Sequence, residues 1–290
     1  MQITKDILER YVNDGWLISQ VHPTLPLTIY NYSQATQYED WWDEVTLSCR
    51  GLVMDNNGNI IARPFRKFFN MEEKRHTPTE DFEVFEKMDG SLGIFFWYAN
   101  EEGLHPVFAS RGSFTSEQAI KGWGMLQKLP YHSLAHFHTH MFEIIYPENR
   151  IVVNYGDAEK LVLLGVIHTS DGREVEWVNI EEHLGHSFEL VKRYDSVSDY
   201  STLKGMISDN AEGFIVKFSN GDRMKIKGEE YLRLHRVMTN VSTTAVWEIL
   251  STGGSMAELL KDVPDEFFDK VDEVVKDLCI RFENIKRDYM

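Results

Sequence analysis

The sequence has few cysteines, no long apolar run and fewer basic than acidic residues. Only Cys49 and Cys279 occur among its 290 residues, far apart in the chain, which argues against a disulfide framework and suits a reducing cytoplasm. No apolar run reaches the roughly 18 residues of a membrane-spanning helix, and the polar N-terminus predicts no secretory signal. With 30 basic and 46 acidic residues, the formal charge of −16 excludes a protein that coats nucleic acid by bulk charge.

Three familiar motifs are also missing. The sequence contains no G-x-x-x-x-G-K-S/T phosphate loop and no G-x-G-x-x-G turn after a predicted strand. It also lacks the G-x-S-x-G turn of serine hydrolases. These absences count against P-loop, Rossmann-type and serine-hydrolase chemistry.

The remaining composition is that of a globular protein, with 42% hydrophobic and 26% charged residues. Short apolar runs between turn residues predict strands, and apolar residues at helical spacing predict helices. We expect strands over residues 51–54, 59–63, 82–87, 92–98, 107–110, 142–145, 151–155, 161–167, 214–218 and 223–227. We expect helices over residues 4–13, 116–129, 180–184 and 264–288.

The texture of the sequence changes near residues 236–244. Strands and turns dominate before this point, and a long amphipathic helical pattern follows it. We therefore expect an α+β main domain over residues 1–240 and a small all-helical C-terminal domain over residues 241–290.

A lysine stands where an apolar strand meets a tight turn, in Glu86-Lys87-Met88-Asp89-Gly90-Ser91. One interpretation is an exposed hairpin lysine. The other is a nucleophile, which must be a free amine although the pKa of lysine is ordinarily about 10.4. Burial or neighbouring cations would lower this pKa, so the second interpretation predicts further cations in similar strand-end positions.

Such cations are present. Lys225 and Lys227 are two residues apart in a predicted strand, so both point to one face of the sheet. Arg50 and Lys67 each adjoin an apolar run, which is unusual for charges that are only solvated. Beside Lys87, these four side chains would bind phosphate and lower the pKa of the nucleophile; the alternative for the lysine pair is a solvated strand face.

Two carboxylates adjoin apolar strands, Glu143 and Glu212. Isolated buried carboxylates are costly and need donors or a metal. One interpretation pairs each of them with a lysine. The other gives them ribose or divalent-metal binding, since hard cations take oxygen ligands.

In this order, the motifs resemble the covalent nucleotidyltransferase superfamily of DNA ligases, RNA ligases and capping enzymes. Further stretches resemble the phage-type ATP-dependent RNA ligase 1 family in particular. The matching stretches are Cys49–Gly51, Arg63–Asn70, Lys87–Ser91, Phe142–Glu143, Pro147–Val152, Leu161–Val166, Glu212–Phe214, Lys225–Lys227 and Tyr231. The resemblance covers residues 45–235 and implies a fold of antiparallel sheets flanked by helices.

The resemblance implies a three-step sealing of RNA. Lys87 would attack ATP and form a lysyl-AMP, AMP would pass to a 5′-phosphate end, and a 3′-hydroxyl would then displace AMP. Arg50, Lys67, Lys225 and Lys227 would hold phosphate oxygens, because phosphoryl-type transfer depends on positioning and charge neutralisation. Mg²⁺ or Mn²⁺ would neutralise the triphosphate, with Glu212 nearby and either in direct contact or linked through water.

The same resemblance implies contacts with the nucleoside. Glu143 would bind the ribose, Glu86 would help to read adenine, and Ile215 would pack on its face. Arg111 matches a position that contacts ribose or phosphate. Asp89 is expected to shape the turn rather than to perform chemistry.

Other functions remain as alternatives. A DNA ligase or capping enzyme usually carries an oligonucleotide-binding barrel after the last lysine motif, and the roughly fifty remaining residues here predict helix instead. The other alternative is a catalytically silent nucleotide- or RNA-binding protein, against which the intact lysine motifs argue. The expected partners are RNA ends, which suggest RNA repair, of transfer RNA for instance, with a separate end-healing kinase/phosphatase. The expected location is the cytoplasm, that of the host cell if the chain is phage-encoded.

Four histidines cluster at His132, His136, His138 and His140, and the last three would alternate on one strand face. Such a row can bind zinc, which prefers nitrogen ligands. No cysteine or carboxylate is spaced to complete a tetrahedral site, so we expect a solvated strand face instead.

Overall fold

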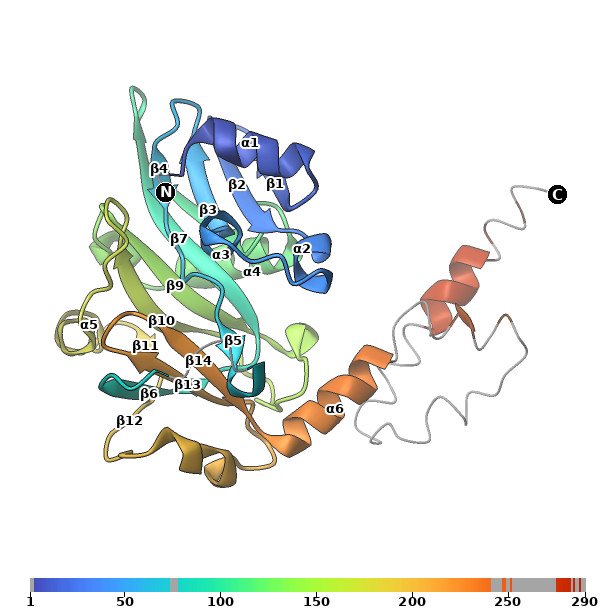
Figure 1. Ribbon diagram of the computed structural model, residues 1–290. Helices are drawn as coiled ribbons and strands as arrows, with labels where there is room; N and C mark the ends of the chain where they lie inside the picture. Colours follow the sequence, from blue (N-terminus) through green and yellow to red (C-terminus); the bar gives the residue numbers. More distant parts are fainter. Residues whose placement is uncertain are drawn as a thin grey trace.

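The computed structural model describes residues 3–73, 78–240, 247–248, 251, 275–282, 284 and 287. Within these residues, three β-sheets form most of the fold, with helices packed against them (Figure 1). This is the predicted α+β architecture of mainly antiparallel sheets flanked by helices. None of the helices described is both long enough and apolar enough to cross a membrane.

The first sheet is antiparallel throughout, in the order β1-β2-β3-β4. Its strands are β1 (Leu17–Val21), β2 (Leu27–Tyr32), β3 (Arg50–Asp55) and β4 (Ile60–Ala62). The helices beside it are α1 (Lys5–Asn13), α2 (Gln34–Tyr38) and α3 (Glu44–Ser48). The predicted β3–β4 turn is confirmed: the Asp55 carboxylate accepts the amides of Asn57 and Asn59 at 2.9 and 2.8 Å.

The second sheet has the order β11-β10-β9-β7-β8. Its strands are β7 (Ser91–Asn100), β8 (Gly103–Ser110), β9 (His138–Ile145), β10 (Lys160–His168) and β11 (Glu189–Leu190). The helices of this region are α4 (Glu117–Leu126), α5 (Trp177–Leu184), and the 3₁₀ turns η2 (Tyr131–Ser133) and η3 (Pro147–Asn149). Ser116 caps α4 as predicted, because its side chain accepts the amide of Ala119.

The third sheet has the order β12-β6-β13-β14-β5. Its strands are β5 (Phe69–Asn70), β6 (Phe82–Lys87), β12 (Arg193–Tyr194), β13 (Gly213–Phe218) and β14 (Arg223–Lys227). The 3₁₀ turns η1 (Met71–Glu73) and η4 (Tyr200–Met206) accompany it. The bounds of β6 are those that the sequence predicts, and the predicted β13–β14 hairpin is confirmed.

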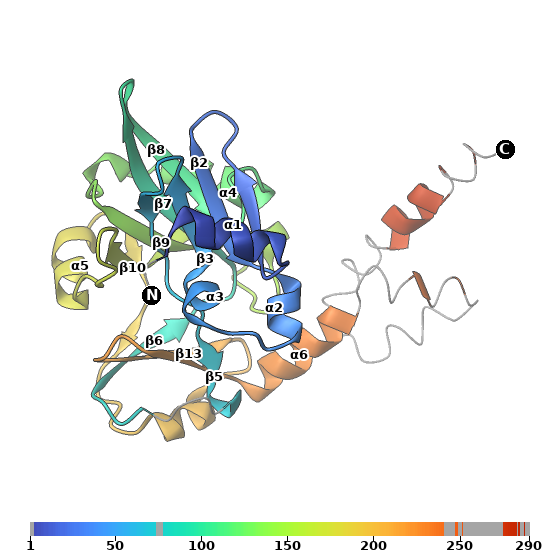
Figure 2. The same ribbon diagram turned by 45° about the horizontal axis from the view of Figure 1, so that its top comes forward.

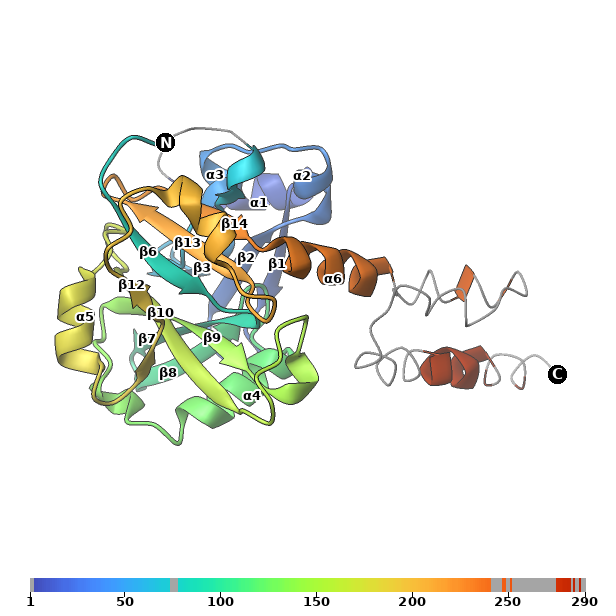
Figure 3. The same cartoon turned by 90° about the horizontal axis from the view of Figure 1, so that it is seen from below.

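The third sheet lies across from the second, as Figures 1 and 3 show. Figure 2 places the first sheet and α1 above the third sheet. The helix α6 (Glu229–Asn240) leaves the body directly after β14. The third sheet joins strands that are distant in the sequence, in the order β12-β6-β13-β14-β5. This pairing positions the site described below.

Several elements differ from the prediction. The sequence patterns do not indicate β1, β2 or α6, and the predicted strand over residues 151–155 is wrong. There, the amides of Val152 and Val153 donate to the Asp89 carboxylate, both at 2.8 Å, and not to a neighbouring strand. The predicted helix over 264–288 and the division at residue 240 fall mostly outside the described residues, of which 275–282 are helical.

The predicted solvated row of histidines is also wrong. His140 is 1% exposed, because β9 has hydrophobic cores on both sides, and this burial lowers its pKa to about 3. His138 instead packs its ring on His168, with centroids 4.3 Å apart. His136 precedes β9 and His132 lies in η2, so neither continues the row. In the parts of the chain described, no group of three His, Cys, Asp or Glu side chains could hold a metal.

Candidate active site

A cavity of about 390 Å³ opens between the second and third sheets, beside the start of β3. All predicted site residues except Glu212 line it: Arg50, Lys67, Glu86, Lys87, Arg111, Glu143, Ile215, Lys225 and Lys227. Glu212 contacts two of these residues directly. The fold thus brings together side chains from three sheets, although their roles stay predictions.

Strand register arranges one face of the third sheet in rows. Because β6, β13 and β14 are adjacent antiparallel strands, paired residues lie side by side. The rows are Lys87–Gly213–Lys227, then Phe85–Ile215–Lys225, then Glu83–Lys217–Arg223. Successive rows are about 6.6 Å apart, since alternate residues of a strand share a face. The prediction that Lys225 and Lys227 share a face is confirmed.

Glu212 bridges the two lysines of the first row. Its Oε2 lies 2.6 Å from the Lys87 Nζ, and its Oε1 lies 2.9 Å from the Lys227 Nζ. Burial opposes the charged carboxylate, but the two ammonium groups outweigh it and hold the pKa of Glu212 below its ordinary value. Gly213, the next residue, lets β13 pack closely on β14: its φ is +144°, and an added Cβ would lie 1.9 Å from the Ile226 carbonyl oxygen.

Further cations surround this row. Burial lowers the pKa of Lys225 to about 7, and the nearby charges of Lys67, Lys87 and Lys227 add to the shift. Burial also lowers the pKa of Lys67. The cavity therefore combines burial with clustered cations, as expected. This combination brings the pKa of Lys225 close to neutral pH.

Aromatic rings support the cations at the mouth of the cavity. The Lys67 Nζ lies 5.1 Å from the ring centroid of Tyr32 and 4.9 Å from that of Trp42. Arg111 donates to the Tyr32 hydroxyl at 3.2 Å. Such contacts stabilise cations without neutralising them, so the side chains keep their charge for an anionic ligand.

Glu143 faces the cavity from β9. Burial raises its pKa to about 8, although Lys87 opposes the shift. The carboxyl is therefore mainly protonated at neutral pH and can donate as well as accept a hydrogen bond. Gly90 lets the Lys87 turn approach β9, because an added Cβ would lie 2.6 Å from the Ile144 carbonyl oxygen.

Asp89 fixes the turn that follows Lys87, as the sequence predicts. It is 3% exposed, and its carboxylate accepts the amides of Val152 and Val153 and the hydroxyl of Tyr231, the last at 2.9 Å. Its own amide donates to the Tyr155 hydroxyl at 2.9 Å. The turn is thus tied to the segment before β10 and to α6. The sequence names Tyr231 within a motif but gives no sign of this bond.

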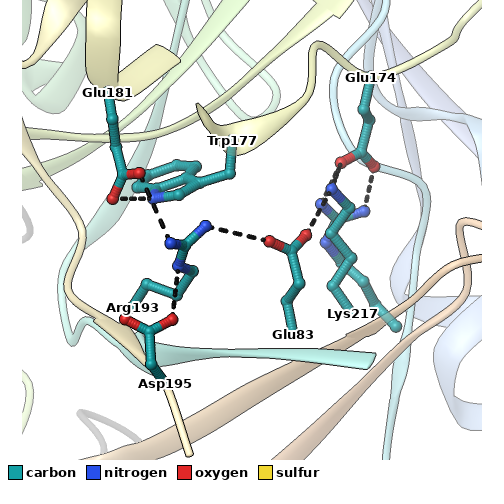
Figure 4. Close-up of polar contacts among 8 residues, drawn as sticks. Glu83, Glu174, Trp177, Glu181, Arg193, Asp195 and Lys217 are labelled. Carbon is teal, nitrogen blue, oxygen red and sulfur yellow. Dashed lines mark hydrogen bonds and ion pairs between the residues drawn. The ribbon is translucent and has the colours of Figure 1, made fainter. Parts of the chain in front are cut away.

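An ionic network lies at the far end of the cavity (Figure 4). Glu174 accepts both terminal nitrogens of Arg223 and lies 3.5 Å from the Lys217 Nζ. Lys217 also lies 3.2 Å from Glu83, whose other oxygen lies 3.5 Å from Arg193. Sequence reasoning missed this network. The alternation of Arg223 with Lys225 on one strand was a usable signal, but the position of Glu174 was not.

The side chain of Glu86 is placed differently from those of its neighbours. Strand alternation directs it away from the face that carries Phe85 and Lys87. Its amide donates to the Lys192 carbonyl at 2.8 Å. The Glu86 carboxylate is therefore directed away from the face that carries Lys87, and its contact with adenine stays a prediction.

The carboxylates of the cavity do not form a preformed metal site. Glu212 directs both oxygens at lysines, Glu174 directs both at Arg223, and the raised pKa of Glu143 keeps it neutral at pH 7. A divalent cation would thus arrive bound to phosphate oxygens, its usual partners. The assignment of Glu212 to the metal stays a prediction.

The family assignment rests on a match over most of the chain. A family model for phage-type RNA ligases, described as RNA ligase, matches residues 48–232. The chain belongs to the RNA ligase family. The matched segment of this family member includes every predicted site residue, from Arg50 to Lys227.

Related proteins agree with this assignment. A protein named as a bifunctional polynucleotide kinase/RNA ligase, from Autographa californica nuclear polyhedrosis virus, is 26% identical over 238 residues, 72% of this chain and 33% of that protein. A protein named as an RNA ligase, from Thermovibrio ammonificans, is 30% identical over 208 residues, 66% of this chain and 53% of that protein. The chain thus spans about a third and about half of the lengths of these relatives.

A solved structure shares the fold. An archaeal ATP-dependent RNA ligase superposes with a TM-score of 0.57 and 13% identity, over 93% of this chain and 75% of that chain. The fold is therefore that of the nucleotidyltransferase domain of ATP-dependent ligases.

Proposed function

We propose that this member of the RNA ligase family is an ATP-dependent RNA ligase that joins 5′-phosphate and 3′-hydroxyl RNA ends. The observation that carries the proposal is the first row of the cavity, where Lys87 and Lys227 share the buried Glu212. Family membership supports RNA as the substrate. The name of the archaeal structure of the same fold supports ATP as the AMP donor.

In the first step, the Lys87 Nζ attacks the α-phosphorus of ATP. An N–P bond forms, and the bond from phosphorus to the pyrophosphate oxygen breaks. Attack requires the neutral amine, so the Lys87 ammonium gives up a proton to solvent before the N–P bond forms. Glu212, 2.6 Å away, stays ionised between the two lysines and holds the Nζ in place. Lys225 and Lys227 hold the phosphate oxygens from the same sheet face, and Arg50 and Lys67 hold them from the mouth of the cavity. Mg²⁺ or Mn²⁺ supplies further charge neutralisation when bound with the triphosphate.

The nucleoside of the bound AMP lies along the rows of the third sheet. In this pose, adenine packs on Ile215, and Glu86 contacts it through the main chain. The ribose meets Glu143, whose protonated carboxyl donates a hydrogen bond at neutral pH. Arg111 supports the sugar or phosphate from the opposite wall.

In the later steps, AMP passes from Lys87 to an RNA 5′-phosphate, and a 3′-hydroxyl then displaces it. A kinase/phosphatase that heals the ends would supply these termini, which the name of the viral relative supports by joining kinase and ligase. We place this reaction, as an RNA or transfer-RNA repair step, in the cytoplasm, that of the host cell if the chain is phage-encoded. We also propose the division into residues 1–240 and a helical domain over 241–290.

Incubation with α-³²P-labelled ATP and Mg²⁺ tests the proposal. Wild-type protein should gain a covalent label that 5′-phosphorylated RNA discharges, and Lys87→Met should gain none. Lys128→Met, an exposed lysine outside the cavity, is the matched control and should label normally. A wild type that gains no label would overturn the enzyme assignment and would favour the alternative of a catalytically silent nucleotide-binding protein. A labelled Lys87→Met would overturn the nucleophile, and discharge by DNA ends alone would overturn the RNA substrate.

A further inference from the structure

Two tryptophans distant in sequence stack on the surface of the first sheet. The ring centroids of Trp16, before β1, and Trp41, after α2, are 5.0 Å apart, with 10° between the ring planes. Trp41 is 50% exposed and Tyr38, at the end of α2, is 85% exposed. We refer to Trp16 and Trp41 as the aromatic platform.

Backbone contacts hold the platform in place. The Trp41 amide donates to the Thr36 carbonyl at 3.0 Å, and the buried Thr36 hydroxyl donates to the Trp16 carbonyl. Asp40 adopts a left-handed φ of 55°, and its carboxylate accepts the Trp42 indole N–H at 2.9 Å. The platform is therefore ordered before any ligand binds, which reduces the entropy cost of binding.

The platform adjoins the mouth of the cavity. Trp42, the next residue after Trp41, packs edge-on against Tyr32 at 5.1 Å and lies 4.9 Å from the Lys67 Nζ. Tyr32, Lys67 and Gln37 of α2 all line the cavity. Figures 1 and 3 place α2 on the side of the body from which α6 leaves. An RNA end held at Lys87 would therefore leave the cavity close to the exposed indole of Trp41.

The acidic residues beside Trp41 determine which part of an RNA strand can bind at the platform. Glu39 and Asp40 directly precede Trp41, and these carboxylates repel phosphate. An aromatic face beside them suits a neutral, flat group. Unpaired bases stack on such faces without sequence preference, and each contributes about 1–3 kcal/mol by alanine substitution.

We propose that Trp41 forms a stacking site for an unpaired base of the RNA strand whose end lies in the cavity. This inference rests on the proposed RNA ligase function and assigns the position of the substrate next to the reacting end. Trp16 supports Trp41 from beneath and is a positioning residue.

Alanine and phenylalanine variants of Trp41 test the site. Binding of a fluorescent, 5′-phosphorylated single-stranded RNA is measured by anisotropy, and lysyl-AMP formation is measured separately without RNA. Trp41→Ala should weaken RNA binding by about 5- to 150-fold, the equivalent of one lost stacking contact. Trp41→Phe should recover most of this loss, and both variants should form lysyl-AMP at the wild-type rate.

Phe137→Ala is the matched control, because Phe137 is 83% exposed but lies before β9 and outside the cavity. Equal loss of RNA affinity in Phe137→Ala and Trp41→Ala, or no loss in Trp41→Ala, would overturn the stacking site. So would a Trp41→Ala variant that binds RNA normally but loses self-association in sedimentation, because the platform would then face a second copy. Absence of lysyl-AMP in wild type refutes the proposed function alone, since RNA binding is measured independently.

Discussion

Tyr231→Phe tests the tie between the Lys87 turn and α6. The Tyr231 hydroxyl donates to the Asp89 carboxylate at 2.9 Å, and the two residues are 2% and 3% exposed. Burial raises the pKa of Tyr231, and the charges of Glu212 and Asp89 raise it further, so the hydroxyl remains a donor at neutral pH. The substitution removes this one donor and keeps the ring.

The size of the effect follows from the charged acceptor. A hydrogen bond to a charged group contributes about 1.5–3 kcal/mol. Asp89 keeps its bonds from the Val152 and Val153 amides in the variant, so the loss should stay within that range. Because 1 kcal/mol shifts Tm by about 2–4 °C in domains of 150–250 residues, we expect Tm to fall by about 3–12 °C.

Thermal unfolding followed by circular dichroism measures the shift. Tyr194→Phe is the control, because its hydroxyl makes no hydrogen bond within the described residues while its ring packs 5.1 Å from Phe214. A double-mutant cycle with Asp89→Asn should give a coupling free energy of at least about 1 kcal/mol. Equal Tm shifts in Tyr231→Phe and Tyr194→Phe, or additive effects in the cycle, would refute the reasoning.

Three further predictions concern the cavity. ATP binding at pH 8 should take up a proton, because phosphate favours the charged form of Lys225, whose pKa burial lowers to about 7; calorimetry in buffers of different ionisation enthalpy measures it, and Lys225→Met should abolish it. Burial raises the Glu143 pKa from 4.5 to about 8, so its stabilisation is complete below pH 4.5 and lost by pH 8; Glu143→Gln should therefore gain stability relative to wild type between pH 5 and 8.5 in denaturant unfolding. Gly213→Ala should lower Tm far more than Gly156→Ala, because an added Cβ meets the Ile226 carbonyl at the first position and nothing within 4 Å at the second.

Each of these three predictions can be contradicted by its own measurement. Proton uptake unchanged in Lys225→Met would assign the uptake to another group. A Glu143→Gln stability difference that does not vary with pH would show that Glu143 is ionised in the folded protein. Equal Tm values for the two glycine variants would show that the strand shifts to accept the methyl group.

Local sequence patterns predicted much of the fold, and the family resemblance added residues that the structure brings to one cavity. Short apolar runs between turn residues located β6, β13 and β14. Period-two alternation placed Lys225 and Lys227 on one face, because side-chain direction in a strand depends only on spacing. The turn after Lys87 was also readable, since Asp89-Gly90 favours a tight turn. The strand predicted over residues 151–155 is wrong because local pattern alone decided it. Its residues are apolar like those of a strand, but the amides of Val152 and Val153 donate to the Asp89 carboxylate.

By itself, the sequence determined the cations, the strand ends that carry them and the family to which they belong. Only the tertiary structure decided which of these groups meet. Glu212 contacts Lys87 across 125 positions of sequence, Glu174 closes the far end of the cavity on Arg223, and Trp16 stacks on Trp41. Such contacts depend on the order in which strands join their sheets, which residue spacing within one strand does not encode. The pKa values of Lys225 and Glu143 follow from those contacts, because burial and neighbouring charges exist only once the sheets have packed.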